Sequence, residues 1–301
     1  MTIPLNPTSD SCQPWLDPRA TIPNDASPVQ RPSLALLGAE PFRAAYELAR
    51  HHMLAKGLPM PSNGHPVVIF PGLGADGRSL SSLRNHCRAL GYDAFDWGQG
   101  FNTGPRGNLD TWLHTLKRQV IDLLAEHAQP VTLIGWSLGG LYAREIGKLM
   151  APRVRQVITI GTPFNAQADH TNVGWLFRLL SGGSTAFDPA LSLRLRTPPP
   201  MRTTSIYSRT DGVVAWQTCC HERCSPRVRD IEVNGSHLGM GWNKQVLNAI
   251  SVTLKASGTA PSDFTGTQPA PGSARSAAAW VAAARPRASK VRSPKPLQDH
   301  R

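Results

Sequence analysis

The chain has 301 residues, 40% hydrophobic and 17% charged, and its 32 Lys and Arg against 20 Asp and Glu give a formal net charge of +12. At roughly 100–200 residues per domain, this length allows one large domain or two small ones with a sizeable core. No run of about 18 apolar residues is present, so the sequence predicts no membrane-spanning helix. The excess of basic residues alone would fit a nucleic-acid or membrane-surface partner.

The compartment is predicted from the first residues and the cysteines. The sequence begins without a basic stretch followed by an apolar one, so no secretory signal is expected. Its five cysteines are too few and too unevenly placed for a disulfide scaffold. We therefore expect a cytoplasmic location.

Strands and helices are expected to alternate along most of the chain, after an extended or disordered N-terminal arm at residues 1–32. Short apolar runs predict strands at 65–72, 92–97, 131–134, 154–160, 204–208 and 229–233. Apolar residues at helical spacing predict helices at 33–57, 79–90, 109–127, 138–150 and 243–254. This alternation predicts an α/β domain over residues 33–255, with a mostly parallel sheet and helices on both faces.

Two segments depart from this alternation. Residues 164–200 contain a cluster of apolar side chains and end in three prolines, which predicts a small cap or lid insertion. Residues 256–301 are dominated by Pro, Ala, Gly and Ser, which predicts a disordered tail. This tail holds seven Lys or Arg against two Asp, so it carries five of the twelve excess positive charges. We interpret it as a solvated linker or, alternatively, as a weak contact to nucleic acid or another anionic surface.

The segment Gly135-Trp136-Ser137-Leu138-Gly139-Gly140 follows an apolar strand and begins an amphipathic helix. A serine on so sharp a turn holds its hydroxyl outward, and its neighbours must be small for the chain to pass. Ser137 is therefore the candidate nucleophile. The alternative is a glycine-rich turn in which the serine is incidental.

A serine nucleophile needs a base, and the base needs a carboxylate to orient it. Of the ten histidines, only His237 lies in a loop after the last predicted strand. Asp211 follows the strand before that one, which gives the hydrolase order of Ser, Asp and His along the chain. The alternatives are a structural loop histidine and an Asp-Gly turn. Asp230 is a weaker candidate because it lies inside a predicted strand.

The negative oxygen that develops during acyl transfer needs fixed hydrogen-bond donors. The backbone N–H of Leu138, next after the serine, is one candidate donor, and that of Leu73 in the Gly-rich loop after the first strand is the other. Trp136, Phe164 and Trp175 are the candidate walls of a substrate pocket. The alternative for the loop of Leu73 is a simple chain reversal.

The cluster of Cys219, Cys220, His221 and Cys224 has the composition of a metal site. Its spacing is not a standard zinc pattern, because adjacent cysteines cannot easily bind one tetrahedral ion. We instead predict that these cysteines are buried thiols or form a local disulfide. We therefore expect no metal and no cofactor.

Together these segments resemble the α/β-hydrolase superfamily, on its bacterial esterase and lipase side. The matching motifs are PGLGADG at 71–77, GWSLGG at 135–140, GTPF at 161–164, SRTDGVVAW at 208–216 and NGSHLGM at 234–240. The resemblance covers residues 33–255 and implies hydrolysis of a small-molecule or lipid-like carboxylic ester through an acyl-enzyme. A thioesterase, amidase or acyltransferase would use the same three residues. A binding module without catalysis on the same fold is the alternative from another class.

Overall fold

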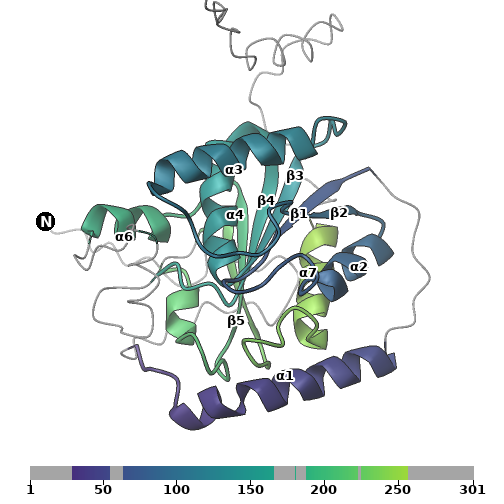
Figure 1. Cartoon of the computed structure of the whole chain (residues 1–301), viewed down its shortest axis with the longest axis vertical. Coiled ribbons are helices and arrows are strands. Elements are labelled where there is room, and N and C mark those ends of the chain that lie inside the picture. The colour runs from purple at the N-terminus through teal and green to yellow at the C-terminus, as the bar shows by residue number, and fades with distance from the viewer. Residues whose placement is uncertain (1–28, 55–63, 166–179, 181–187, 223–224, 257–301) are drawn as a thin grey trace, which may run out of the picture. The chain divides into compact units, whose positions relative to one another are not determined.

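A computed structural model describes residues 29–54, 64–165, 180, 188–222 and 225–256. Its centre is a parallel sheet of six strands in the order β2-β1-β3-β4-β5-β6 (Figure 1). The strands are β1 (Pro66–Phe70), β2 (Asp93–Asp96), β3 (Val131–Trp136), β4 (Val154–Ile160), β5 (Arg202–Ser208) and β6 (Val228–Val233). All six strands expected from the sequence are present, and their bounds agree to within two residues. The predicted α/β fold is therefore confirmed.

Helices cover both faces of this sheet, as expected. They are α1 (Leu34–Leu54), α2 (Ser81–Ala89), α3 (Leu109–Leu123), α4 (Leu138–Leu149), α6 (Pro189–Arg196) and α7 (Lys244–Ala256), with short 3-10 turns η2 (Ala151–Arg153) and η3 (Trp216–Cys219). The helices α3 and α4 lie on one face, and α2 and α7 lie on the other (Figure 1). None of the described helices is long and apolar enough to cross a membrane.

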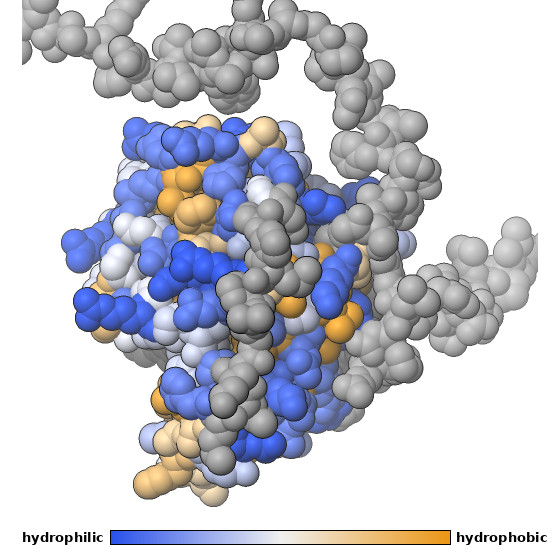
Figure 2. Space-filling model, turned by 90° about the vertical axis from the view of Figure 1, so that its right-hand side faces the viewer, coloured by the Kyte–Doolittle hydropathy of each residue, from blue (hydrophilic) through white to orange (hydrophobic). Residues whose placement is uncertain are grey.

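The core has two parts because the side chains of a strand alternate between the two faces of its sheet. On β3, Leu133 packs in the cluster with Leu116 of α3 and Leu141 of α4. Its neighbour Ile134 packs in the opposite cluster, which includes Leu83 of α2. The side of the molecule on which α2 and α7 lie is mostly hydrophilic at its surface, with smaller apolar patches (Figure 2).

The central strand should carry much of the stability. Leu133 has no exposed surface, so Leu133→Ala should lower the free energy of unfolding by about 2–5 kcal/mol through lost burial and a residual cavity. Leu193→Ala is the control, because Leu193 is 59% exposed on α6 and its loss should change the stability by less than about 0.5 kcal/mol. Chemical denaturation measures both, and equal losses would contradict this assignment of the core.

Three predicted segments are described only in part. Within 164–200 the structure shows α6, whose first turn is capped by the Asp188 carboxylate accepting from the N–H groups of Ala190 and Leu191. The stretches 166–179 and 181–187 lie outside the described residues, as do 1–28 of the arm and 257–301 of the tail. The cap, the arm and the disordered tail therefore stay predictions.

Candidate active site

Ser137 lies at the sharp turn between β3 and α4. Its φ of 53° makes it the one non-glycine residue with a positive φ in the part of the chain that the structure describes. Such a conformation costs free energy and persists only where the surroundings impose it. The backbone N–H of Ser137 donates to the carbonyl oxygen of Ile160 on β4 (2.8 Å), which helps hold the turn.

The glycines around Ser137 are required by close packing. A Cβ atom on Gly135 would collide with the backbone of Gly139 and Gly140, which lies across the turn. A Cβ atom on Gly139 would collide with the carbonyl oxygen of Phe70 at the end of β1. The small residues expected on either side of the serine thus allow α4 to start against two strands.

The structure brings together the three residues predicted to form a catalytic triad. His237 Nε2 lies 3.1 Å from Ser137 Oγ, and His237 Nδ1 lies 2.6 Å from Asp211 Oδ2. The second oxygen of Asp211 accepts from the N–H groups of Val213 (2.8 Å) and Val214 (2.7 Å). Asp211 therefore caps its own turn with one oxygen and orients the histidine with the other.

Charges around the imidazole favour its protonated form. Burial by itself lowers the pKa of His237, but the charge and hydrogen bond of Asp211, together with the charge of Glu40, outweigh it, so the pKa is raised above its ordinary value. In the neutral ring, Nδ1–H donates to the Asp211 carboxylate, which leaves Nε2 to accept from the serine hydroxyl. This is the tautomer that a general base requires.

The two predicted oxyanion donors lie at the ends of β1 and β3. Leu138 is the first residue of α4, where helix geometry leaves its N–H without an intrahelical acceptor. Leu73 lies in the loop after β1, and Asn102 holds this loop on both sides of Leu73. Asn102 Nδ2 donates to the carbonyl oxygen of Pro71 (2.8 Å), while its backbone oxygen accepts from Gly74 (2.9 Å).

Asn102 was not among the residues singled out from the sequence. It follows β2, and β2 pairs with β1, so the two loops emerge side by side. Its side chain is fully buried, and its Oδ1 accepts from the N–H of Gly104 (3.0 Å). The adjacency of β1 and β2 could have pointed to Asn102 as a support of the loop of Leu73. Using this signal requires the order of the strands in the sheet, which the sequence does not supply.

Loosening this loop should reduce turnover. If the N–H of Leu73 is an oxyanion donor, as predicted, Asn102→Ala, which removes the bond to Pro71 and lets this N–H shift, should lower kcat by about 10²-fold. Steady-state kinetics with a chromogenic hydrolase substrate measures the loss. Asn108→Ala is the matched control, since Asn108 caps the exposed start of α3. Equal kcat values for the two variants would show that Asn102 does not support the donor loop.

The profile of the Alpha/beta hydrolase family matches residues 67–286. The chain belongs to the Alpha/beta hydrolase family. This settles the superfamily that the motifs indicated, and the parallel sheet agrees with it. A search of the curated proteins gives no match to this sequence.

Several solved structures are similar to this chain at low sequence identity. Lipase B of Aspergillus fumigatus is 16% identical with a TM-score of 0.51, and the match covers 64% of this chain and 52% of that one. The monoacylglycerol lipase of Paleococcus ferrophilus is 14% identical with a TM-score of 0.48, over 65% of this chain and 96% of that one. Est1E from Butyrivibrio proteoclasticus is 11% identical with a TM-score of 0.48, and the match covers 66% of this chain and 92% of that one.

The residues expected to line a pocket in this family member have different surroundings. Trp136 is 8% exposed, and its Nε1 donates to the carbonyl oxygen of His237 (3.2 Å), so it supports the histidine loop from β3. Phe164 is buried, with the Arg144 guanidinium 3.8 Å from its ring centre. Trp175 lies outside the described residues. The pocket assignment of all three stays a prediction.

A second histidine–carboxylate pair lies in the cysteine-rich segment. His221 Nδ1 is 2.6 Å from Asp230 Oδ1, and His221 Nε2 is 3.1 Å from Nη1 of Arg144. Cys219 and Cys220 are buried free thiols, while Cys224 is not among the described residues. No group of three or more His, Cys, Asp or Glu within the described ranges could hold a metal ion. His221 thus belongs to a buried polar network.

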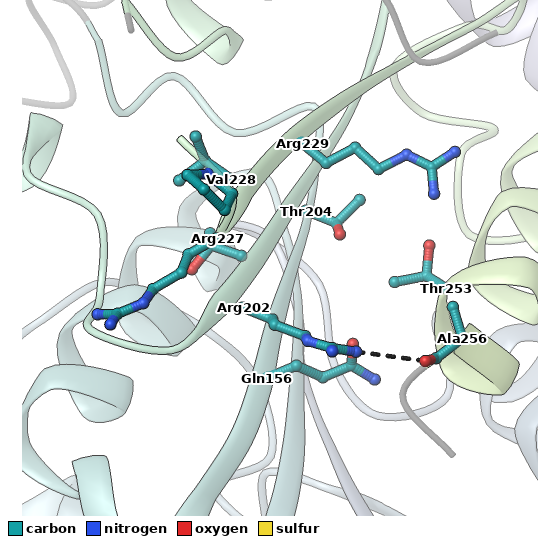
Figure 3. A pocket seen from close by; sticks show the side chains of 10 residues that line it. Gln156, Arg202, Thr204, Arg227, Val228, Arg229, Thr253 and Ala256 are labelled. Atoms are coloured by element: carbon teal, nitrogen blue, oxygen red, sulfur yellow. Dashed lines mark hydrogen bonds between the residues drawn. The ribbon is translucent and has the colours of Figure 1, made fainter. Parts of the chain in front are cut away.

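A pocket with several arginines lies at the amino-terminal ends of the strands, whereas Ser137 lies at their carboxyl ends. It is formed where β4, β5 and β6 begin, and Arg202, Arg227 and Arg229 line it (Figure 3). Nη1 of Arg202 donates to the carbonyl oxygen of Ala256 (3.2 Å) at the end of α7. Because Ser137 follows the carboxyl end of β3, this pocket is separate from the candidate active site.

Proposed function

We propose that this protein is a serine hydrolase that cleaves a carboxylic ester through an acyl-enzyme. The observation that carries the proposal is the continuous series of hydrogen bonds from Asp211 through His237 to Ser137 at the turn before α4. A nucleophile, its base and the group that orients the base, within hydrogen-bond reach of each other, are the arrangement that acyl transfer needs. Membership of the family supports the same reaction class.

The reaction would proceed in two halves. Ser137 Oγ attacks the ester carbonyl carbon while His237 Nε2 takes the hydroxyl proton, and the carbonyl oxygen becomes an oxyanion between the N–H groups of Leu73 and Leu138. When the oxyanion collapses, the bond to the alcohol breaks, and His237 gives the proton to the leaving oxygen. A water molecule then attacks the acyl-enzyme with His237 as base, which releases the acid and restores Ser137.

Apolar side chains near the site favour a lipid-like ester or another ester with an apolar acyl group. Leu73 of the oxyanion loop is 40% exposed, and Leu238, next after the histidine, is 38% exposed. Phe101, adjacent to Asn102, is 61% exposed. Exposed apolar groups close to a reactive serine fit the binding of an apolar acyl chain. Neither a metal nor a cofactor takes part in the proposed route.

Labelling with a fluorophosphonate tests the proposal directly. The probe should attach covalently to one serine, which peptide mass spectrometry should identify as Ser137. Nitrophenyl esters of increasing chain length, a thioester and an ester with an added acceptor alcohol then separate esterase, thioesterase and acyltransferase activity. A folded protein that neither labels nor turns over any of these substrates would instead be a binding module.

A further inference from the structure

The helix α1 lies along the two loops that carry Asp211 and His237. It is outside the two helical layers of the sheet, at one end of the molecule's ordered core (Figure 1). The contact is close, because a Cβ atom on Gly212, next after Asp211, would meet the backbone of Leu36 at 2.6 Å. The polar residues of α1 that face these loops are Glu40, Arg43 and Glu47.

Glu40 binds both loops at once. Its Oε1 accepts from the backbone N–H of Gly212 (2.7 Å) and from that of His237 (3.0 Å). Its Oε2 accepts from the N–H of Leu238 (3.0 Å). The side chain is 1% exposed, and three donors on two separate loops converge on one carboxylate. No other residue in the described ranges joins the candidate acid's loop to the candidate base's own backbone by hydrogen bonds that the structure records.

Two further residues on the same face of α1 hold the outer parts of these loops. Arg43 Nη2 donates to Thr210 Oγ1 (2.9 Å), in the residue before Asp211. Glu47 Oε1 accepts from the N–H of Ser236 (2.9 Å), in the residue before His237. Their spacing places them on one helical face. Glu40 lies between them and is the member that touches the base.

We propose that Glu40 is a positioning residue for the reaction: its buried carboxylate sets the separation of the loops that bear Asp211 and His237, and so the approach of the imidazole to Ser137. This inference rests on the proposed function. Charge-assisted hydrogen bonds to a carboxylate are shorter and stronger than neutral ones. A rigid joint at this point suits a base that must stay aligned to within a fraction of an ångström.

The charge of Glu40 also acts on the imidazole. It is one of the groups that raise the pKa of His237, with Asp211 the larger contributor and burial acting in the opposite direction. Arg43, with Nη1 3.7 Å from Glu40 Oε1, is the cation on the same helix. From η3, Cys219 faces Asp211, and burial raises the pKa of its thiol well above the ordinary value, so it stays neutral. Removing the charge of Glu40 should therefore lower the pKa of His237.

The test compares Glu40→Gln and Glu40→Ala in the full chain. Glu40→Gln keeps the shape but loses the charge and replaces one accepting oxygen with an amide NH₂ donor, and it should lower kcat/KM by about tenfold, mainly through kcat. Because the neutral imidazole is the active form, the acid limb of its pH–rate profile should move to lower pH. Glu40→Ala should lose about 10²-fold. An NMR titration of the His237 ring in wild type and Glu40→Gln gives the pKa change without relying on turnover.

Glu47→Gln is the matched control. It removes a carboxylate from the same helix face, but this carboxylate contacts Ser236 rather than His237, so the acid limb should stay in place. An unchanged kcat/KM in Glu40→Gln, or a loss of rate with neither the acid limb nor the ring pKa moved, would overturn the inference. If wild type itself neither labels nor turns over esters, the proposed function fails, and the ring titration still decides whether Glu40 acts on His237.

Discussion

Ser137→Ala should lower kcat for ester hydrolysis by about 10⁶-fold, because the variant retains the oxyanion donors and the base but has no group to form the acyl-enzyme. The variant should also fail to react with a fluorophosphonate. Its fold should be intact, since the methyl group of alanine occupies space that the serine Cβ already fills. Steady-state assays with a nitrophenyl ester measure the loss of kcat, and thermal unfolding checks that the variant is folded.

The control for this variant is a serine away from the turn. Ser81 begins α2 and is partly exposed, so Ser81→Ala should keep both kcat and labelling. A Ser137→Ala protein that retains kcat within tenfold of wild type would remove Ser137 from the proposed mechanism. The family's fold would then carry a different nucleophile or no catalytic function.

The largest effect on stability should come from Asp230→Ala, at about 3–5 kcal/mol. Arg144 on α4 has no exposed surface, and burial lowers its pKa to about 9 against the raising effect of the nearby Glu145 and Asp230 charges. Its guanidinium donates to the ring of His221, which in turn is bonded to Asp230. Without this carboxylate, the buried guanidinium of Arg144 loses a compensating negative charge, and the ring N–H and backbone N–H of His221 lose their acceptor.

The matched control lies two residues further along the same strand. Glu232 is about as exposed as its partner Arg209, at 42% against 43%, so the ion pair between them is screened by solvent. Its carboxylate also accepts from the hydroxyl of the buried Tyr207, so Glu232→Gln, which keeps a side-chain oxygen as acceptor, should cost at most about 1 kcal/mol. Urea titration of both variants compares their free energies of unfolding, and thermal unfolding of Asp230→Ala should show a Tm lower by about 10 °C. Similar losses of unfolding free energy in the two variants would show that the network of Arg144, His221 and Asp230 contributes little to stability.

Local patterns explain why the secondary structure was predictable. A strand such as β3 is a short run of apolar residues bounded by turn residues, and the serine turn that follows it needs glycines at defined spacing. Both signals depend on neighbours within a few positions. The same is true of Asn108, which caps α3 through the N–H groups two and three residues ahead. The strand and helix bounds therefore followed from the sequence with small errors.

The candidate triad was predictable because each member lies directly after a predicted strand. In a parallel sheet the carboxyl ends of all strands meet at one edge, so residues 137, 211 and 237 share that edge whatever their separation in sequence. His221 and Asp230 form an equally short pair, and only the structure shows that this pair contacts Arg144 while His237 contacts Ser137.

The sequence alone determined the excess of positive charge, of which five charges lie in the tail. It also determined the strands and helices, the serine turn and the order of the three candidate catalytic residues. Only the tertiary structure determined which residues hold the loops of that site in place. Glu40 is 197 residues from His237, and Asn102 is 31 residues from Pro71. No periodicity marks such residues, since their role depends on which loops the folded sheet brings against them. Close packing and the need of buried polar groups for partners select them only after the chain has folded.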